Sequence, residues 1–381
     1  MKKYIYYIAE ADFSRGHASA NRILNNARAI AATGKYDVGL IGYGNIPYRE
    51  FHEFPLYNVS YGTASLGKAW HYARRGREVR KLLEKLPQKA DMIVYYGSSR
   101  RYLSQLRKYA DKHCIPLVAD VVEWYDPAAL KFGRFGPVAR DTHIGITRWV
   151  EQCDGVIAIS SYLERHFRDR VDVTARIPVL VDTRIVPQDD EQIEKLFEPQ
   201  YLNLVYAGMP RKKDLITDMI RVVEKLAGQG HPIKLHLLGP DRELVESLGT
   251  PRTSEAIVFH GRIAQDKVNT YLRYADFSVL LRPDNRRSNA GFPTKFVESL
   301  NAGLPVVANV TSDLGLYLED GYDGYIVADP QAESLRQKLE ELVRLDRKSL
   351  NDLKKNAKRV AERYFDYRGY SGVFDEFLGS L

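Results

Sequence analysis

Short hydrophobic runs alternate with longer amphipathic segments along almost the whole chain. In its first part the apolar runs have the length of strands, and the segments between them are long enough for helices. This rhythm is typical of βαβ units, in which helices cover both faces of a parallel sheet. It predicts strands at residues 4–9, 38–43, 92–96, 116–120 and 156–159.

The segment after the first predicted strand has the clearest helical pattern. Apolar residues recur there at positions 23, 24, 27, 30 and 31, which share one face of a helix. Ser19 is expected to cap the start of this helix, and Gly34 is expected to end it.

The alternation breaks between residues 177 and 200, where prolines and an acidic cluster indicate a linker. It then restarts, and a largely helical tail rich in Tyr and Phe closes the chain. The second series of predicted strands lies at residues 202–207, 233–238, 257–259, 277–281, 305–308 and 324–327.

We therefore predict an α/β protein with two Rossmann-like, doubly wound parallel-sheet domains that face each other across a cleft. The domains are expected at residues 1–182 and 201–362, with a linker at 183–200. A terminal helix within residues 363–381 is expected to pack back on the first domain. Ligands of open parallel sheets bind beyond the carboxyl ends of the strands, so a ligand is expected in the cleft.

Composition adds limits to this picture. Of the 381 residues, 44% are hydrophobic and 28% are charged, which is typical of a globular protein and argues against wholesale disorder. Cys114 and Cys153 are too few for a disulfide framework, so a reducing cytoplasm is the expected setting. No run approaches the ~20 apolar residues that cross a bilayer. The net charge of +7 suits a phosphorylated ligand, an anionic membrane surface or nucleic acid.

Residues 70–89 combine seven Lys and Arg with only two Glu, interleaved with apolar side chains. This basic amphipathic pattern fits either a solvated helix face or peripheral attachment to anionic lipid. Residues 131–137 have a similar aromatic and basic character, but the segment is too short to interpret alone.

The most informative motif lies within residues 289–308, a strand–loop–helix–Gly–strand unit in which Pro293 is expected at the first helical position. The backbone N–H groups of Thr294 and Lys295, the helix dipole and the Lys295 ammonium form an anion site that suits a diphosphate. Glu298 follows about one turn later, and a carboxylate there can accept two hydrogen bonds from a vicinal diol such as a ribose. The motif therefore predicts a nucleotide site.

Together with segments spread over nearly the whole chain, the motif Pro293–Lys295 with Glu298 makes the sequence resemble the family-four retaining glycosyltransferases. These enzymes have the two-domain GT-B architecture and use nucleotide-activated sugars. Pro293–Lys295 with Glu298 is the most specific part of the resemblance. The other matching segments are Gly16–Arg22, Val156–Ser161, Tyr206–Gly208, Leu237–Pro240, Val258–Gly261, Tyr274–Asp276 and Pro305–Val307.

The resemblance implies a set of donor-binding residues and one departure. The family has two glutamates separated by seven residues, and Ala290 stands where the first is expected. Nucleotide binding through the second, Glu298, is retained, whereas recognition of the donated sugar by the first carboxylate is lost. The implied donor-binding residues are Gly16, Lys213, Gly291, Phe292, Thr294, Lys295 and Glu298.

A basic turn follows the strand at 202–207. The resemblance implies that Lys213 and Arg211 act as catalytic cations that neutralise the departing diphosphate, with Met209 where an Arg is usual. The assignment among Arg211, Lys212 and Lys213 stays open, and a solvated basic turn is the alternative. The sequence has no Asp-x-Asp triplet, so cation neutralisation without a metal or another cofactor is expected.

Candidate acceptor or sugar-binding residues lie in the first domain. Asp120 and Glu123 could accept hydroxyl hydrogens, and Trp124 could offer a flat face to a sugar. A turn in which Asp120 caps the next helix is equally compatible. His17, beside Gly16, could approach the donor phosphate or the acceptor, or could be an ordinary surface histidine.

The expected activity is therefore a metal-independent, hexosyltransferase-type glycosyl transfer. It would move a sugar from a nucleoside-diphosphate donor, such as a UDP- or GDP-sugar, to a saccharide or lipid-linked saccharide. Retention of configuration and a role in surface polysaccharide or glycolipid synthesis are implied by the resemblance alone. The expected location is cytoplasmic, including the inner membrane face. No Walker or aromatic-basic RNA motif points to nucleic acid. The alternatives are a non-catalytic sugar-nucleotide-binding subunit, motivated by Ala290, and a GT-B sugar-nucleotide epimerase.

Overall fold

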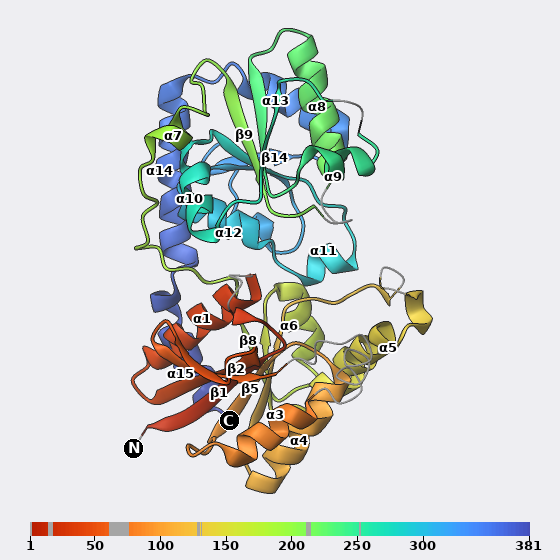
Figure 1. Cartoon of the computed structure of the whole chain (residues 1–381), viewed down its shortest axis with the longest axis vertical. Helices are drawn as coiled ribbons and strands as arrows, with labels where there is room; N and C mark the ends of the chain where they lie inside the picture. Colours follow the sequence, from red (N-terminus) through yellow and green to blue (C-terminus); the bar gives the residue numbers. More distant parts are fainter. Residues whose placement is uncertain are drawn as a thin grey trace. The chain divides into compact units, whose positions relative to one another are not determined.

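The computed structural model describes residues 2–13, 18–60, 76–127, 130, 132–210, 215–250 and 253–381. The chain divides into two compact units (Figure 1). Unit 1 contains residues 1–180, 289–292 and 367–381, and unit 2 contains residues 181–288 and 293–366. Each unit is built around its own sheet.

Unit 1 has an eight-stranded sheet in the order β3-β4-β2-β1-β5-β6-β7-β8. All described pairings are parallel except that of β3 with β4. The strands are β1 (Lys3–Ala9), β2 (Tyr36–Tyr43), β3 (Tyr48–Phe51), β4 (Phe54–Val59), β5 (Met92–Tyr96), β6 (Leu117–Val121), β7 (Gly155–Ala158) and β8 (Val173–Arg176).

The predicted strands of this sheet are confirmed, with small shifts at their ends, whereas β3, β4 and β8 were not predicted. These three lie at or next to the two edges of the sheet. β3 and β8 are only half-buried, so their sequences lack the continuous apolar run that marks a central strand.

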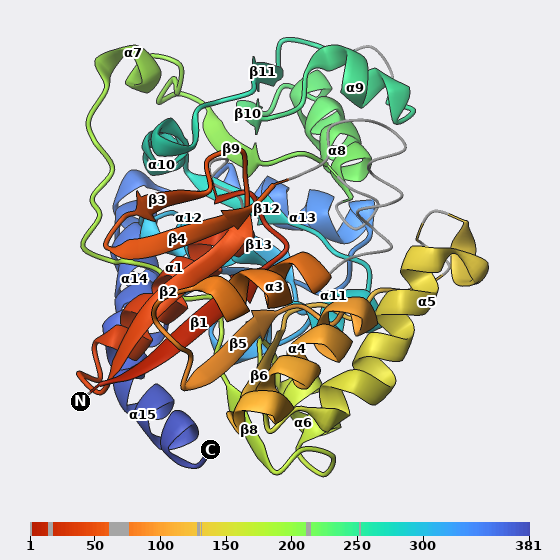
Figure 2. The ribbon, with the colours of Figure 1, turned by 60° about the horizontal axis from the view of Figure 1, so that its bottom comes forward.

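The helices of unit 1 include one from the end of the chain. They are α1 (Ala18–Ala31), α3 (Arg77–Lys85), α4 (Arg100–His113), α5 (Pro137–Ile144), α6 (Ser161–Phe167) and α15 (Ser371–Gly379). Ser19 is the second residue of α1, so its expected capping position was wrong, whereas Gly34 does follow the helix with a left-handed φ of 74°. Helices α3 and α4 lie side by side (Figure 2).

The terminal segment packs into the core of unit 1. Phe374, Phe377 and Leu378 of α15 are buried in one cluster with Ile5 and Tyr7 of β1. The segment that groups with unit 1 starts at residue 367 rather than 363, because α14 (Arg347–Tyr364) continues through Tyr364 as part of unit 2.

Unit 2 has a six-stranded, parallel sheet in the order β11-β10-β9-β12-β13-β14. All six strands were predicted from the sequence, and their ends differ by at most two residues. They are β9 (Leu202–Ala207), β10 (Ile233–Leu238), β11 (Ile257–Gly261), β12 (Phe277–Leu280), β13 (Val306–Asn309) and β14 (Gly324–Val327).

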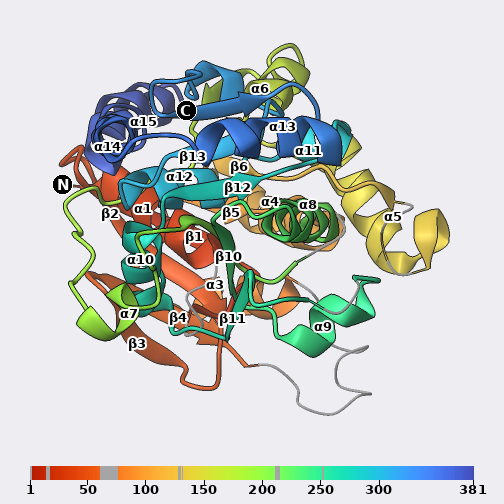
Figure 3. The same ribbon diagram turned by 90° about the horizontal axis from the view of Figure 1, so that it is seen from above.

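Helices cover both faces of this sheet (Figure 3). Leu204 and Tyr206 of β9 pack in a cluster with α8 and α13, whereas Val205 faces a cluster with α7 and α10. The helices are α7 (Glu191–Glu194), α8 (Ile216–Gly228), α9 (Arg242–Ser247), α10 (Gln265–Tyr274), α11 (Arg286–Ala290), α12 (Thr294–Asn301), α13 (Ala332–Leu342) and α14.

The expected linker at 183–200 is not a free connection. Its second half contains α7, and Ile193 and Phe197 are buried against Val205 and Leu238 of the sheet. Prolines and acidic residues suggested a linker, but two apolar side chains among them anchor the segment to unit 2.

Candidate functional site

The predicted anion site lies at the carboxyl end of the unit 2 sheet, where two strands end in glycines. Gly208 follows β9 with φ 119°, and Gly239 follows β10 with φ 120°, a conformation that L side chains rarely adopt. The Gly208 N–H donates to the Leu238 carbonyl over 2.7 Å, and the Gly239 N–H donates to the Gly261 carbonyl over 2.7 Å. A Cβ at Gly239 would lie 3.0 Å from the carbonyl carbon of Gly208. The strand ends therefore form a tightly packed backbone surface.

The eight-residue helix α12 begins with Thr294, and Pro293 occupies its N-cap position with φ −75° and ψ 106°. The expected place of Pro293 at the first helical position was therefore wrong by one residue. Pro293 makes no side-chain hydrogen bond to this end of the helix. The Phe296 N–H donates to the Pro293 carbonyl over 3.1 Å, and the positive end of the helix dipole makes the helix start favourable for an anionic group.

Lys295 joins this helix start to the glycine surface. Its Nζ lies 3.8 Å from the centroid of the buried Tyr206 ring on β9, a cation–π contact. A Cβ at Gly208 would lie 3.0 Å from the Lys295 Cε, so the lysine stem passes directly over this glycine. Two motifs that are far apart in the sequence, residues 206–208 and 293–298, thus meet at one place.

Glu298 lies three residues after Lys295, on the same side of α12. Burial raises the pKa of the Glu298 carboxyl, and the nearby Lys295 ammonium partly opposes this shift. An ammonium and a carboxylate therefore share one short helix face, next to an uncapped helix start.

Sequence reasoning missed Arg282 and Asn309, which lie at the same edge of the sheet. Arg282 is buried just after β12, and its backbone N–H donates to Asn309 Oδ1 over 2.9 Å. Asn309 Nδ2 donates back to the Arg282 carbonyl over 2.8 Å, which ties the ends of β12 and β13 together. Their only sequence signal is that each stands at or just beyond the end of an apolar run.

The segment before α12 groups with unit 1, and it contains the predicted donor residues Gly291 and Phe292. Both are buried, and Ala290 is fully buried at the end of α11, where a loop was expected. The Ser160 hydroxyl donates to the Ala290 carbonyl over 2.7 Å. Ser160 also caps α6, accepting from the Leu163 N–H over 3.4 Å. A buried methyl group thus occupies the place of the family's first glutamate.

Asp120 has a structural position that the sequence did not reveal. It is fully buried on β6, and Arg22 donates to it from Nη2 over 2.7 Å and from Nε over 3.0 Å. The Tyr7 hydroxyl donates to it over 2.6 Å, and Arg22 also bonds to the carbonyls of Ile177 and Pro178. Both carboxylate oxygens are therefore engaged inside unit 1. This contradicts the expected role of Asp120 as a sugar ligand or a helix cap.

Glu123 and Trp124 follow β6 and are both half-buried. The Trp124 ring packs edge to face against His166, with centroids 4.6 Å apart, and against Tyr162 at 6.4 Å. These contacts fix Trp124 on α6 and leave part of its surface exposed.

Several predicted residues lie outside the described part of the chain. They are Gly16, His17, Arg211, Lys212 and Lys213, together with residues 70–75 of the basic segment. Within the described ranges, no group of three His, Cys, Asp or Glu side chains is arranged to hold a metal ion. In the same ranges no helix is long and apolar enough to span a bilayer.

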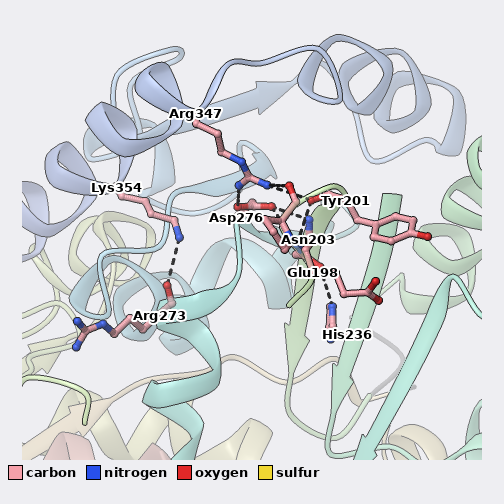
Figure 4. Close-up of polar contacts among 9 residues, drawn as sticks. Glu198, Tyr201, Asn203, His236, Arg273, Asp276, Arg347 and Lys354 are labelled. Carbon is pink, nitrogen blue, oxygen red and sulfur yellow. Dashed lines mark hydrogen bonds and ion pairs between the residues drawn. The ribbon is translucent and has the colours of Figure 1, made fainter. Parts of the chain in front are cut away.

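A second polar cluster of unit 2 involves β9, β10 and the residue before β12 (Figure 4). Asp276 accepts from the Asn203 N–H over 2.7 Å and from Arg347 Nη1 over 2.8 Å. Asn203 Oδ1 lies 3.1 Å from His236 Nε2, and Lys354 Nζ donates to the Arg273 carbonyl over 3.2 Å. Asn203, Asp276, His236 and Arg347 are thus linked in one chain of contacts, which indicates a structural role, whereas Lys354 and Arg273 contact each other separately.

Comparison with known proteins points to the same region of unit 2. Residues 188–360 match the family model described as glycosyl transferases group 1. WcaL of Salmonella typhimurium, whose name assigns it to colanic acid biosynthesis as a glycosyltransferase, is 26% identical over 181 residues. These residues are 46% of this chain and 44% of WcaL, so the chain matches less than half of the length of that relative.

Solved structures resemble the whole chain. Sucrose-phosphate synthase from Thermosynechococcus elongatus has a TM-score of 0.76 at 14% identity, over 100% of this chain and 99% of its own. HepE of Anabaena, solved with UDP and glucose, has a TM-score of 0.70 at 16% identity, over 99% and 100%. WaaG, a glycosyltransferase involved in lipopolysaccharide biosynthesis, has a TM-score of 0.67 at 16% identity, over 98% and 100%. The predicted fold class is confirmed: the chain has the two parallel-sheet α/β domains of the GT-B fold, and its second half matches the glycosyl transferases group 1 model.

Proposed function

We propose that the protein is a glycosyltransferase that moves a sugar from a nucleoside-diphosphate sugar to a hydroxyl group. The observation that carries this proposal is the placement of Lys295, whose ammonium lies over Tyr206 at the uncapped start of α12. Glu298 follows on the same helix face. A positive helix start suits a diphosphate, and a carboxylate one turn later suits the ribose of the same nucleotide.

The comparisons support this reading without naming the substrate. The structure of HepE contains UDP and glucose, and WaaG and WcaL are named for lipopolysaccharide and colanic acid synthesis. We therefore take a nucleoside-diphosphate sugar as the donor and a saccharide or lipid-linked saccharide as the acceptor, within surface polysaccharide or glycolipid synthesis.

The proposed reaction breaks the bond between the sugar C1 and the diphosphate oxygen and forms a bond from C1 to the acceptor oxygen. Retention follows if the acceptor attacks on the face that the diphosphate leaves, and the departing phosphate then takes the acceptor proton. Negative charge grows on the leaving oxygen, and cations must meet it. Lys295 and the α12 start supply part of this charge, and Lys213 and Arg211 are proposed to supply the rest without a metal.

Purified protein incubated with UDP-, GDP- and ADP-sugars tests the proposal. Transfer, or slow donor hydrolysis with nucleotide release, is the expected result. Lys295→Met and Glu298→Gln should each weaken donor binding about tenfold or more, as measured by calorimetry, since each removes a charge-assisted contact. Glu333→Gln, on the exposed side of α13, is the matched control. Donor binding that is equal in all three variants would remove the proposed site.

A sugar-nucleotide-binding subunit without turnover is the second candidate, and the buried Ala290 favours it. In that case donor binding would saturate, with no nucleotide release at any acceptor concentration. Interconversion of the sugar without transfer would instead identify an epimerase.

A further inference from the structure

The turn that precedes α5 in unit 1 carries the two most exposed large apolar side chains of the described residues. Phe132 is 72% exposed and Phe135 is 88% exposed. Phe132 has a left-handed φ of 69°, a conformation that is unusual for a bulky residue. Gly133–Phe135 then form a short 3₁₀ turn. The backbone is thus bent so that both rings stand on the surface rather than in the core.

Helix α5 holds this turn at the periphery of unit 1, and its start lies away from the sheet (Figures 1 and 2). The other parts of α5 are fixed. The Ser99 hydroxyl donates to Asp141 Oδ2 over 2.6 Å, and the Arg101 N–H donates to Asp141 Oδ1 over 3.2 Å. At the end of the helix, a Cβ at Gly145 would lie 1.6 Å from the Ser98 carbonyl oxygen, so only glycine allows this close contact. The aromatic turn therefore projects from a well-anchored base.

The segment that contains the turn and α5 is rich in basic residues. Residues 131–148 include Lys131, Arg134, Arg140 and Arg148, but Asp141 as their one acidic residue. Asp141 is buried, whereas Arg140 and Arg148 are exposed. Arg140 is the fourth residue of α5 and follows Phe135 by five residues, so it is the exposed cation closest to the turn in the described sequence, whereas Arg148 lies beyond the far end of the helix.

The basic segment at residues 70–89 suggested lipid binding. Its described part, α3, does not offer apolar side chains for insertion into a bilayer. Val79 and Leu83 of α3 are buried in unit 1, so this helix presents charges such as Arg77, Lys81 and Lys85 and no apolar face. The buried apolar residues of α3 are therefore not available for insertion into a bilayer.

We propose that the Phe132–Phe135 turn docks on an anionic lipid bilayer, with both rings in the headgroup–acyl boundary and Arg140 facing the lipid phosphates. Exposed rings next to a cation suit the surface of an anionic membrane, where negatively charged headgroups cover an apolar acyl region. A convex turn also suits a soft bilayer better than a groove-forming protein partner. The proposal does not depend on the proposed function, because it needs no nucleotide sugar and no turnover.

Co-sedimentation with vesicles tests it, with phosphatidylcholine vesicles compared with vesicles that also contain phosphatidylglycerol. The full chain is expected to bind the anionic vesicles only. The double variant Phe132→Ser/Phe135→Ser should weaken binding by about a hundredfold, since each buried ring contributes about tenfold. Arg140→Gln should also weaken binding and should reduce its salt dependence.

The matched control is Ile185→Ser/Val186→Ser, an exposed apolar pair in the acidic 183–191 segment. It should bind as the wild type does. In Phe135→Trp, anionic vesicles should shift the added tryptophan emission to shorter wavelength, which reports insertion rather than surface attraction. Circular dichroism checks that each variant is folded. The proposal is overturned if the wild type ignores anionic vesicles, if the double Phe variant binds them equally well, or if that variant only changes self-association in sedimentation.

Discussion

Acidification should weaken unit 2 through one buried histidine, His236, and the hydrogen bonds around it set the sign (Figure 4). Asn203 Nδ2 donates to the carbonyls of Glu198 and Tyr201, so Asn203 Oδ1 is left to accept from His236 Nε2 over 3.1 Å. His236 Nδ1 must then accept from His260 Nε2 over 3.0 Å. A proton on His236 would place two donors face to face.

The size of the effect follows from the pKa of His236. Burial, with help from His260 and Lys234, lowers this pKa from 6.5 to about 3. Below pH 6.5 the unfolded chain therefore binds a proton that the folded chain does not, so stability is lost as the pH falls toward 3. At about pH 5 the loss is about 2 kcal/mol, at 1.36 kcal/mol for each pH unit below the unfolded pKa.

Hydrogen exchange of β9 and β10 amides, followed by mass spectrometry at about pH 7 and about pH 5, measures this loss locally. In His236→Gln the side chain has no titrating group, so the variant should be less stable than the wild type at about pH 7 but should lose about 2 kcal/mol less on acidification. His231→Gln, a partly exposed histidine of the same unit, is the control. Equal acid losses in wild type and His236→Gln would refute the reasoning.

Other perturbations follow from the described contacts. Burial raises the pKa of Asp323 from 3.8 to about 6, so the folded state loses stability as the pH rises between these values. In thermal unfolding, Asp323→Asn should therefore gain about 3 kcal/mol at neutral pH and nothing near pH 4. Arg22→Met should cost about 3–5 kcal/mol in urea unfolding, because it leaves the Asp120 charge buried and unpaired, and adding Asp120→Asn should recover part of the loss. Ser160→Ala should raise the donor KM about fivefold by releasing the Ala290 carbonyl, whereas Ser160→Thr should stay near wild type.

The parts of the fold that were predictable are those whose signal is local. β9, β10 and β14 are short apolar runs, and their predicted bounds match the structure. The edge strands β3 and β8 could not be recognised in this way, because half-buried edge residues include polar side chains that do not form an apolar run.

The same distinction applies to α15, whose aromatic residues predicted packing but not its first residue. The boundary depends on where α14 ends. The terminal segment was expected to begin at residue 363, but α14 continues without a break to Tyr364. The residues around Tyr364 do not show, from the sequence alone, whether this part of the chain belongs to unit 1 or to unit 2.

Asp120 shows why a chemical motif can be misread when its partners are distant. The acidic and aromatic residues after β6 resemble a sugar-binding segment, yet Arg22 and Tyr7 are 98 and 113 residues away in sequence, and they use both carboxylate oxygens. Lys295 and Glu298 were recognisable because their shared helix face needs only a spacing of three residues. The contact of Lys295 with Tyr206 could be expected only from the rule that strand ends gather at one edge of a parallel sheet. A residue type therefore predicts a binding role best when the geometry that supports the role is local. Asp120 does not meet this condition, because distant residues, Arg22 and Tyr7, bind its carboxylate in the core.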